Sequence, residues 1–215
     1  MYETVIFDLD GTVIDSAEGI MNSFAYAFGR MGLPARPRAE MGIFIGPPLL
    51  YSFETICGLE RAEAERAVEI YREYYREKGI YEIKVYDGVE ELLKKLKAHG
   101  KHILLATSKY EPYAVQILRN IGLYEYFELA AGSLAGTERG TKAEVIKYAL
   151  ERTGAARETA VMVGDRMQDT VGAREAGVDS IGALWGYGSR AELSGGGATH
   201  IASLPEDVLA IACGE

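Results

Sequence analysis

The sequence predicts an α/β protein, a doubly wound parallel sheet with a smaller all-helical domain inserted after the first strand. Two observations support this prediction. From residue 80 onward, short continuous apolar runs alternate with amphipathic segments, as expected for a parallel sheet covered by helices on both faces. Residues 16–81 break this alternation, because they carry helical patterns and no convincing strand. We therefore expect a core domain of residues 1–15 and 82–215 and a helical domain of residues 16–81.

The first element is an apolar run that begins at Val5 and ends in two carboxylates, Asp8 and Asp10. Gly11 follows and allows a sharp turn of the backbone. Two neighbouring like charges at the end of a buried strand disfavour ionisation, so such a pair needs a cation, a shared proton or a chemical purpose.

The next elements are the helices of the insert. Residues 17–32 form one amphipathic pattern that stops at Gly32, and Pro47 and Pro48 begin a short helix. Residues 61–79 predict a long helix whose buried stripe consists of Ala64, Ala67, Val68, Tyr71 and Tyr75. The arginines of this segment interleave with glutamates on its polar side.

The remaining elements alternate in type. Continuous apolar runs predict strands at residues 102–108, 159–165 and 179–185, whereas helical periodicity covers residues 88–100, 111–122 and 141–154. Each of these helical patterns ends in glycine, a frequent helix terminator. We expect residues 193–199, which contain three consecutive glycines, to form a flexible surface loop.

Composition restricts the class of protein. The 215 residues, 48% of them hydrophobic and 26% charged, are enough to bury a substantial core. A net charge of −9 argues against nucleic acid or an anionic membrane as a partner. The sequence has neither a signal-peptide pattern nor the ~18–20 apolar residues of a membrane span. We expect a cytoplasmic protein, monomeric or weakly dimeric, with Cys57 and Cys213 unpaired.

Polar residues gather where the predicted strands end. Ligands of open parallel sheets bind in the crevice at the carboxyl ends of the strands. The residues expected at this edge are Asp8, Asp10, Thr107, Ser108, Lys142, Asp165 and Asp169. The aspartates offer the hard oxygen ligands that Mg²⁺ prefers, while the hydroxyls and Lys142 offer donors to phosphate oxygens. In such a site one aspartate can attack phosphorus, and a second can transfer protons.

These residues carry a family resemblance. The stretches DLDGTVIDS, ATSK and VGDRMQD, together with Lys142, resemble the four signature motifs of haloacid dehalogenase-like phosphatases, in the family's order and spacing. The resemblance implies a Rossmann-like core, with the helical insert as the cap domain of the family. One departure is Arg166, at a position where a small hydroxyl residue is common.

The resemblance also implies roles for the site residues. Asp8 would be the nucleophile and Asp10 the general acid/base. Mg²⁺ would be bound by Asp8, the backbone carbonyl of Asp10 and Asp165, with Asp169 completing or supporting this set. Thr107, Ser108 and Lys142 would bind phosphate. The implied partner is a small phosphorylated metabolite.

Several other functions fit these residues less well. A calcium-binding EF-hand loop also begins with D-x-D, but its twelfth position needs glutamate, and Gly19 stands there. A dehalogenase has no use for a second acid or a metal, whereas a phosphomutase would have to retain the phosphoryl group. A phosphorylatable signalling receiver needs no large helical insert. Residues 186–191 match a dinucleotide fingerprint but lack the long helix that should follow.

The substrate must be selected outside the shared motifs. Residues 44–53 and 71–82 resemble the cap of the 5′-nucleotidase-like branch, a close relative of phosphoglycolate phosphatases. A nucleotide base would stack on aromatic rings such as Phe44 or Phe53, whereas phosphoglycolate would call for a basic residue facing the site. Lys109 and Arg139 are further candidates for substrate contact.

Overall fold

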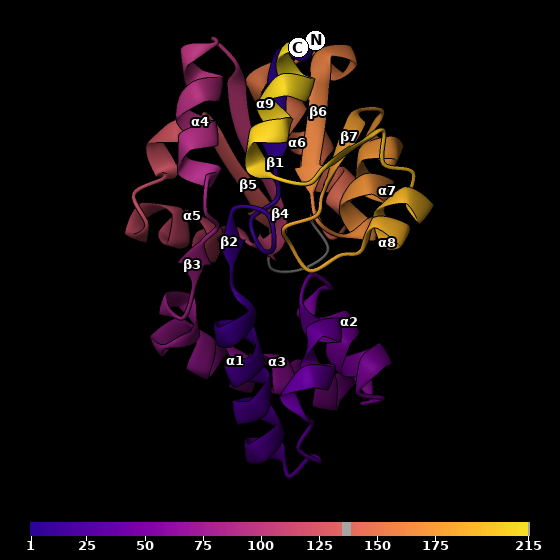
Figure 1. Ribbon diagram of the computed structural model, residues 1–215. Coiled ribbons are helices and arrows are strands. Elements are labelled where there is room, and N and C mark those ends of the chain that lie inside the picture. Colours follow the sequence, from indigo (N-terminus) through magenta and orange to yellow (C-terminus); the bar gives the residue numbers. More distant parts are fainter. Residues whose placement is uncertain (135–138, 215) are drawn as a thin grey trace. The chain divides into compact units, whose positions relative to one another are not determined.

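The chain forms two units (Figure 1). The computed structural model describes residues 1–134 and 139–214. Contacts between Cα atoms group Met1–Ile14 with Val85–Glu215 as the first unit and Asp15–Lys84 as the second. Below, these are called the core unit and the helical unit.

A six-stranded parallel sheet organises the core unit. Its strand order is β5-β4-β1-β6-β7-β8, so the chain proceeds outward from β1 in one direction and then in the other. The α/β fold predicted from the sequence is confirmed. The bounds are β1 (Thr4–Phe7), β4 (His102–Tyr110), β5 (Leu129–Ser133), β6 (Ala160–Gly164), β7 (Asp179–Ala183) and β8 (His200–Ala202).

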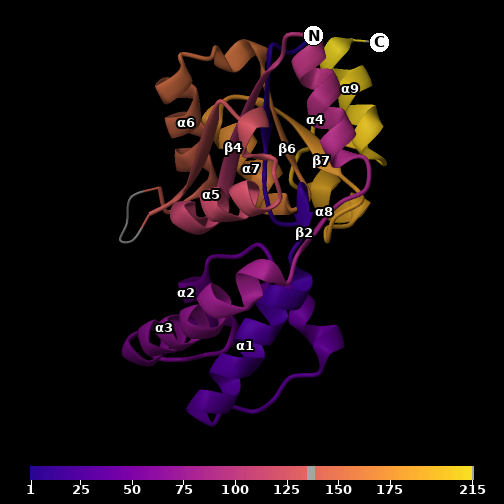
Figure 2. The same ribbon diagram turned by 90° about the vertical axis from the view of Figure 1, so that its left-hand side faces the viewer.

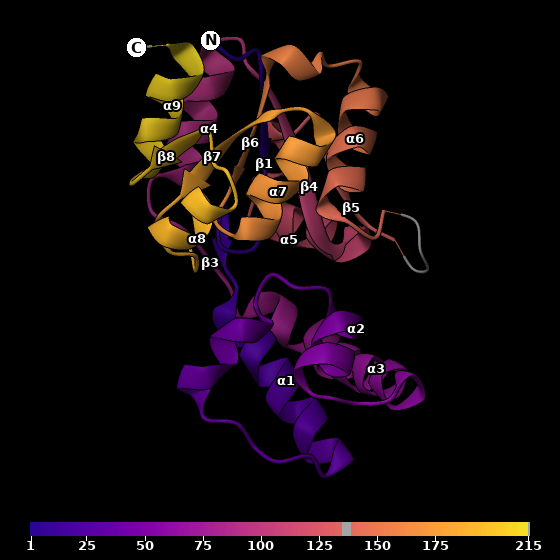
Figure 3. The same ribbon diagram turned by 90° about the vertical axis from the view of Figure 1, so that its right-hand side faces the viewer.

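Helices cover both faces of this sheet (Figures 2 and 3). Helices α4 and α9 pack together on one face, and α6 packs with α7 on the other. The bounds are α4 (Val89–Ala98), α5 (Glu111–Asn120), α6 (Lys142–Thr153), α7 (Met167–Ala176), α8 (Arg190–Gly195) and α9 (Pro205–Cys213), with short 3-10 turns at η4 (Tyr124–Tyr126) and η5 (Arg157–Thr159).

The start of α6 is fixed by local chemistry. Thr141 accepts a hydrogen bond from the backbone N–H of Glu144 at 3.2 Å, and the Glu144 carboxylate accepts one from the Thr141 N–H at 3.0 Å. This capping box satisfies backbone donors that would otherwise lack partners. It places Lys142 in the first turn of α6.

One hydrophobic core of this unit lies between the sheet and helices α6 and α7. Ile6, Leu104 and Met162 come from three adjacent strands and are fully buried. Val145 and Ile146 of α6 pack against them. Because these strands are buried on both faces, their sequences are continuous apolar runs and show no alternation.

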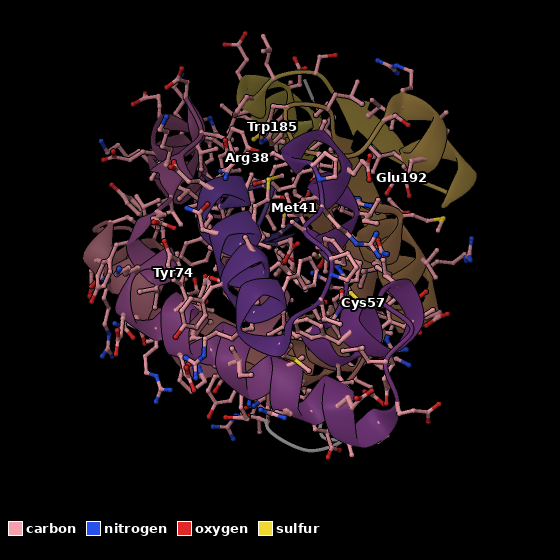
Figure 4. The ribbon with its side chains drawn as sticks, turned by 90° about the horizontal axis from the view of Figure 1, so that it is seen from below. Arg38, Met41, Cys57, Tyr74, Trp185 and Glu192 are labelled. Carbon is pink, nitrogen blue, oxygen red and sulfur yellow. The ribbon has the colours of Figure 1, made fainter. Side chains whose placement is uncertain are left out.

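The helical unit contains α1 (Ala17–Met31), η1 (Arg38–Phe44), α2 (Leu49–Tyr51), η2 (Ser52–Ile56), α3 (Arg61–Glu77) and η3 (Gly79–Tyr81). The predicted stripe of α3 is buried against this unit's interior. Its core is aromatic. The centroid of the Phe24 ring lies 4.4 Å from the ring centroid of Phe44, 5.0 Å from that of Phe53 and 4.9 Å from that of Tyr71. In Figure 4, the labelled Tyr74 and Cys57 lie toward opposite sides of this unit, while Arg38 and Met41 lie close together.

Two short strands mark the passage between the units. β2 (Ile14–Asp15) and β3 (Lys84–Val85) form a separate two-stranded sheet. The chain therefore leaves the core unit and returns to it at neighbouring positions.

Three further sequence expectations have outcomes here. The expected loop at residues 193–199 is wrong at its start, because α8 extends to Gly195 and Leu193 is fully buried. Cys57 and Cys213 are both free thiols, as expected. Over residues 1–134 and 139–214, no helix has the length and apolar character needed to cross a membrane.

Candidate active site

The central strands deliver the polar residues of the site. Phe7 of β1 is in register with Leu105 of β4 and Val163 of β6, so the residues that follow these strands emerge side by side. Asp8 begins this edge, and its N–H donates to the Val163 carbonyl at 2.9 Å. Gly11, at a φ of 85°, then turns the chain back, and its N–H donates to the Ile14 carbonyl at 2.8 Å.

Three carboxylates gather at this edge. One oxygen from each of Asp8, Asp165 and Asp169 lies within 4.8 Å of the others, and all three side chains are buried. Asp165 follows β6, and Asp169 lies in the first turn of α7. The sequence expectation that these three residues converge is confirmed in their geometry.

Lys142 is the cation inside this cluster. Its Nζ lies 2.8 Å from Asp8 Oδ1 and 2.8 Å from Asp169 Oδ1, and it donates to the Ala106 carbonyl at 3.1 Å. The lysine is only 6% exposed. Although burial alone would lower its pKa, the charges of Asp169 and Asp8 raise the pKa above the ordinary value.

Two of these carboxylates, those of Asp8 and Asp165, resist ionisation. Burial, with the repulsion of Asp169 and Asp10, raises the pKa of Asp8 to about 6 in spite of the attraction of Lys142. Burial and the charge of Asp169 raise the pKa of Asp165 well above its ordinary value. When all three groups are ionised, three carboxylates face one ammonium, which leaves an excess of two negative charges.

This excess makes the cluster suitable for a divalent cation. The Oδ1 atoms of Asp8 and Asp169 are buried and accept no well-directed hydrogen bond from the described residues, although Lys142 is near both. Carboxylate oxygens that lie this close together are hard donors of the kind that Mg²⁺ prefers. The residues present therefore fit the cation expected from the sequence.

Asp10 has a separate partner. Lys109 Nζ lies 2.7 Å from Asp10 Oδ2 and 2.9 Å from Asp10 Oδ1, so one ammonium holds both carboxylate oxygens. Both side chains are about nine-tenths buried. The contact fixes the orientation of Asp10, and it joins residues 99 positions apart in sequence.

An irregularity in β4 positions the phosphate-binding candidates. Between Ala106 and Tyr110 the register with β5 shifts, because four steps along β4 match two steps from Ala131 to Ser133. Such a bulge redirects side chains at the end of a strand. Thr107 is buried, and its Oγ1 accepts the Lys109 N–H at 3.2 Å. Ser108 follows it in the bulge and is partly buried.

Both carboxylate oxygens of Asp165 accept hydrogen bonds, one from a backbone donor and one from a side-chain donor. The Tyr187 N–H donates to Asp165 Oδ2 at 2.7 Å, and Thr12 Oγ1 donates to Asp165 Oδ1 at 3.3 Å. The Trp185 indole donates to the Thr12 carbonyl at 2.9 Å. These contacts were not anticipated from the sequence, because no local pattern links residues 12, 165 and 187.

Arg166 is also paired. Its Nε donates to Glu192 Oε1 at 2.8 Å, and the same oxygen accepts the Met167 N–H at 3.0 Å. Partial burial would raise the pKa of Glu192, but these hydrogen bonds hold it below the ordinary value. Meanwhile the backbone N–H of Arg166 donates to Asp169 Oδ2 at 3.0 Å. Glu192 is a further residue of this region that the sequence analysis did not identify.

Two of the substrate candidates have a different role in this structure. Phe44 and Phe53, expected to contact a substrate, are 1% and 0% exposed and pack inside the aromatic core of the helical unit, so the structure gives that expectation no support. Arg139 is engaged as well, since its Nη1 lies 2.6 Å from Glu111 Oε2 and its guanidinium lies over the Tyr148 ring. Lys109 alone among these candidates contacts a predicted catalytic residue.

Comparison with known proteins agrees with this geometry. A model of the family described as haloacid dehalogenase-like hydrolase matches residues 5–183. A 5′-nucleotidase of Pseudomonas aeruginosa is 41% identical over 199 residues, which cover 93% of this chain and 90% of that protein. The tyrosine-protein kinase PtkA of Mycobacterium tuberculosis is 40% identical over 86% of this chain, but the match spans only 63% of the length of PtkA.

The solved structures give the same result. The crystal structure of a predicted phosphatase from Clostridium acetobutylicum has a TM-score of 0.96 and 38% identity, with all of both chains covered. The chain therefore belongs to the haloacid dehalogenase-like hydrolase family, and it is a phosphoric monoester hydrolase of that family.

Proposed function

We propose that this phosphatase is Mg²⁺-dependent and acts through a covalent phosphoryl intermediate on Asp8. The observation that carries the proposal is the buried cluster of Asp8, Asp165 and Asp169, two of which, Asp8 and Asp169, contact Lys142. A cluster with excess negative charge repels a phosphate dianion unless a cation is bound. Mg²⁺ would be held by Asp8, Asp165, Asp169 and the Asp10 carbonyl, and it would neutralise charge on the phosphoryl oxygens when bound.

The chain's own residues would carry the two chemical steps. An Asp8 oxygen forms a bond to phosphorus while the ester P–O bond breaks, and Asp10 gives a proton to the departing oxygen. Asp10 then takes a proton from water as the water oxygen bonds to phosphorus. The bond between Asp8 and phosphorus breaks, so inorganic phosphate leaves and the aspartate is restored. Lys142, Thr107 and Ser108 would bind the phosphoryl oxygens throughout.

The helical unit would act as the cap that selects the leaving group. We propose residues 16–81 as this cap and residues 1–15 and 82–215 as the catalytic domain. Because the phosphoryl-binding residues of the core are the same for any phosphomonoester, discrimination between substrates must come from elsewhere in the chain. A cap that closes over the site would also exclude bulk water during the reaction.

We infer that a nucleoside 5′-monophosphate is the substrate, within the class of small phosphorylated metabolites. The similarity to a protein named 5′-nucleotidase supports this choice. Two arginines of α3 pair with glutamates of the same helix, Arg61 with Glu65 at 2.7 Å and Arg72 with Glu69 at 2.8 Å, in agreement with the interleaved charges of this segment. Stacking on Phe44 or Phe53 no longer supports it, since both rings are buried.

A substrate panel tests this choice. The kcat/KM values for nucleoside monophosphates, phosphoglycolate, sugar phosphates and phosphotyrosine would be compared under one condition. We expect a nucleoside monophosphate to rank first. A tenfold or greater preference for phosphoglycolate over every nucleotide would establish the alternative, a phosphoglycolate phosphatase.

The chemistry is tested separately from the substrate. Chelation should abolish hydrolysis of a chromogenic phosphate ester, and added Mg²⁺ should restore it. Asp8→Asn should remove turnover, whereas Asp15→Asn, a matched change outside the cluster, should not. Full activity in the presence of chelator would refute the metal assignment. Transfer of the phosphoryl group to a second substrate position, with no release of inorganic phosphate, would indicate a phosphomutase.

A further inference from the structure

The glycine-rich stretch at residues 186–191 packs directly against Asp165. A Cβ atom on Gly186 would collide with the Gly11 carbonyl and the Asp165 side chain, and one on Gly188 would collide with the Asp165 carbonyl. Glycine is therefore required here for close approach of two backbones. The pattern that resembles a dinucleotide fingerprint is explained by this packing.

This stretch is held in place at its far end by Glu192. The Glu192 carboxylate lies on α8 and binds both the Arg166 side chain and the Met167 N–H, as described above. These two residues directly follow Asp165 and open α7. The Glu192 carboxylate thus connects α8, which follows the glycine-containing stretch, to Arg166 and Met167, which follow Asp165. Figure 4 labels Glu192 and Trp185, which lie near the two ends of this segment.

Glu192 also controls where the charge of Arg166 lies. Arg166 is the neighbour of Asp165 in sequence, and its backbone N–H donates to Asp169 at 3.0 Å. The cluster beside it carries an excess of carboxylates, which attract a guanidinium as well as a metal ion. Because Glu192 binds the Arg166 side chain at 2.8 Å, the guanidinium has a partner outside the cluster.

We propose that Glu192 is a positioning residue for the cation site. By binding the Arg166 side chain at 2.8 Å, it limits the competition of this guanidinium with a divalent cation for the oxygens of Asp8, Asp165 and Asp169. This inference rests on the proposed function only in assuming that these carboxylates bind Mg²⁺. It adds a residue, on a different helix, that sets the affinity of the site.

Trp185 offers a measurement of binding that does not depend on activity. It is the one tryptophan of the 215-residue chain. Its indole donates to the Thr12 carbonyl at 2.9 Å, and the Thr12 hydroxyl donates to Asp165 at 3.3 Å. Because Thr12 binds both groups, cation binding at the Asp165 carboxylate should alter the surroundings of the Trp185 indole and so its fluorescence. Emission from the full-length, metal-free chain would be followed while Mg²⁺ is added, and calorimetry would give an independent dissociation constant.

Four proteins would be titrated: wild type, Glu192→Gln, Glu192→Gln with Arg166→Ser, and Glu128→Gln. We expect Glu192→Gln to weaken Mg²⁺ binding about 10- to 100-fold, the usual effect of losing a residue that supports metal ligands. The added Arg166→Ser should restore binding to within about threefold of wild type, because the competing cation is gone. Glu128, which pairs with His102 at 2.9 Å at the protein surface, is the matched control and should leave binding unchanged.

The outcomes separate this inference from the proposed function. Wild-type affinity in Glu192→Gln, or a double variant that binds no better than Glu192→Gln, would overturn the inference alone. Failure of the wild-type chain to bind Mg²⁺ in calorimetry would overturn both the inference and the metal dependence of the proposed function.

Discussion

Replacing Asp8 with asparagine should stabilise the metal-free protein while it abolishes turnover. Burial and the repulsion of Asp169 and Asp10 raise the pKa of Asp8 from 3.8 to about 6. Since the folded state therefore favours the protonated carboxyl, ionisation of Asp8 opposes folding at higher pH. At about 1.4 kcal/mol per pH unit, the difference corresponds to about 3 kcal/mol above pH 6. An asparagine carries no charge and removes this penalty.

The pH dependence gives the prediction its direction. The stabilisation by Asp8→Asn should be fully present at pH 7.5, decline as the pH falls through about 6, and vanish below 3.8, where both side chains are neutral. Urea unfolding of wild type and variant in excess chelator, at pH 7.5 and at pH 4, would measure the difference. Added Mg²⁺ should stabilise wild type more than the variant, because binding to the folded state adds to its stability. A variant no more stable than wild type at pH 7.5 in chelator would refute the electrostatic reasoning.

Three other changes test separate parts of the structure. Lys142→Met leaves the buried carboxylates of Asp8 and Asp169 without a counter-charge, so the free energy of unfolding, measured with urea at pH 7.5, should fall by about 3–5 kcal/mol. A fall of less than about 1 kcal/mol would contradict the assignment of Lys142 as their buried counter-charge. Lys109→Met frees Asp10 to reorient but leaves its carboxyl in place, so we expect kcat to fall about 10- to 100-fold, no more than the lower end of the 10²–10⁴ that general acid–base catalysis contributes; an unchanged kcat and pH–rate profile would remove Lys109 from the mechanism. Phe24→Ala deletes the ring at the centre of the aromatic core and should destabilise the helical unit by about 3–5 kcal/mol, as followed by hydrogen exchange, while Mg²⁺ binding by the core unit persists; loss of that binding would show that the two units do not fold separately.

The central part of the fold could be predicted because its signals are local. β1, β4 and β6 are apolar runs that end at polar residues, β7 belongs to a further apolar run, and the helices between them have clear periodicity and glycine stops. The edge strands lack such signals. β5 (Leu129–Ser133) contains mostly small residues, and β8 (His200–Ala202) has only three residues, so neither appears as an apolar run.

The site residues could be predicted in identity but not in pairing. The position of Asp8 after β1 and of Asp165 and Asp169 after β6 was enough to predict that they lie at one edge of the sheet, because neighbouring parallel strands in register end together. The partnership of Lys109 with Asp10 depends on the bulge in β4, which no residue pattern announces. Long-range pairs of this kind arise from the register of the sheet, not from neighbours in sequence.

The aromatic residues of the helical unit show another limit of sequence reasoning. A ring that packs in a core and a ring that stacks on a ligand have the same apolar pattern. Phe44 and Phe53 lie on either side of the predicted helix start at Pro47 and Pro48, and both rings fill the interior around Phe24. Burial of this kind is decided by tertiary packing.

The pairing of β2 with β3 has a consequence for how this enzyme could diversify. Because the chain departs after Ile14 and returns at Val85 through adjacent strands, the distance that an inserted segment must span is short and independent of its size. Insertions whose ends lie close together disturb the host domain least. The proposed catalytic residues all belong to the host, so evolution or an engineer could exchange the insert for one of another length or sequence and keep the same chemistry. New substrates could then be acquired by grafting at this junction, with no change to the residues that handle the phosphoryl group.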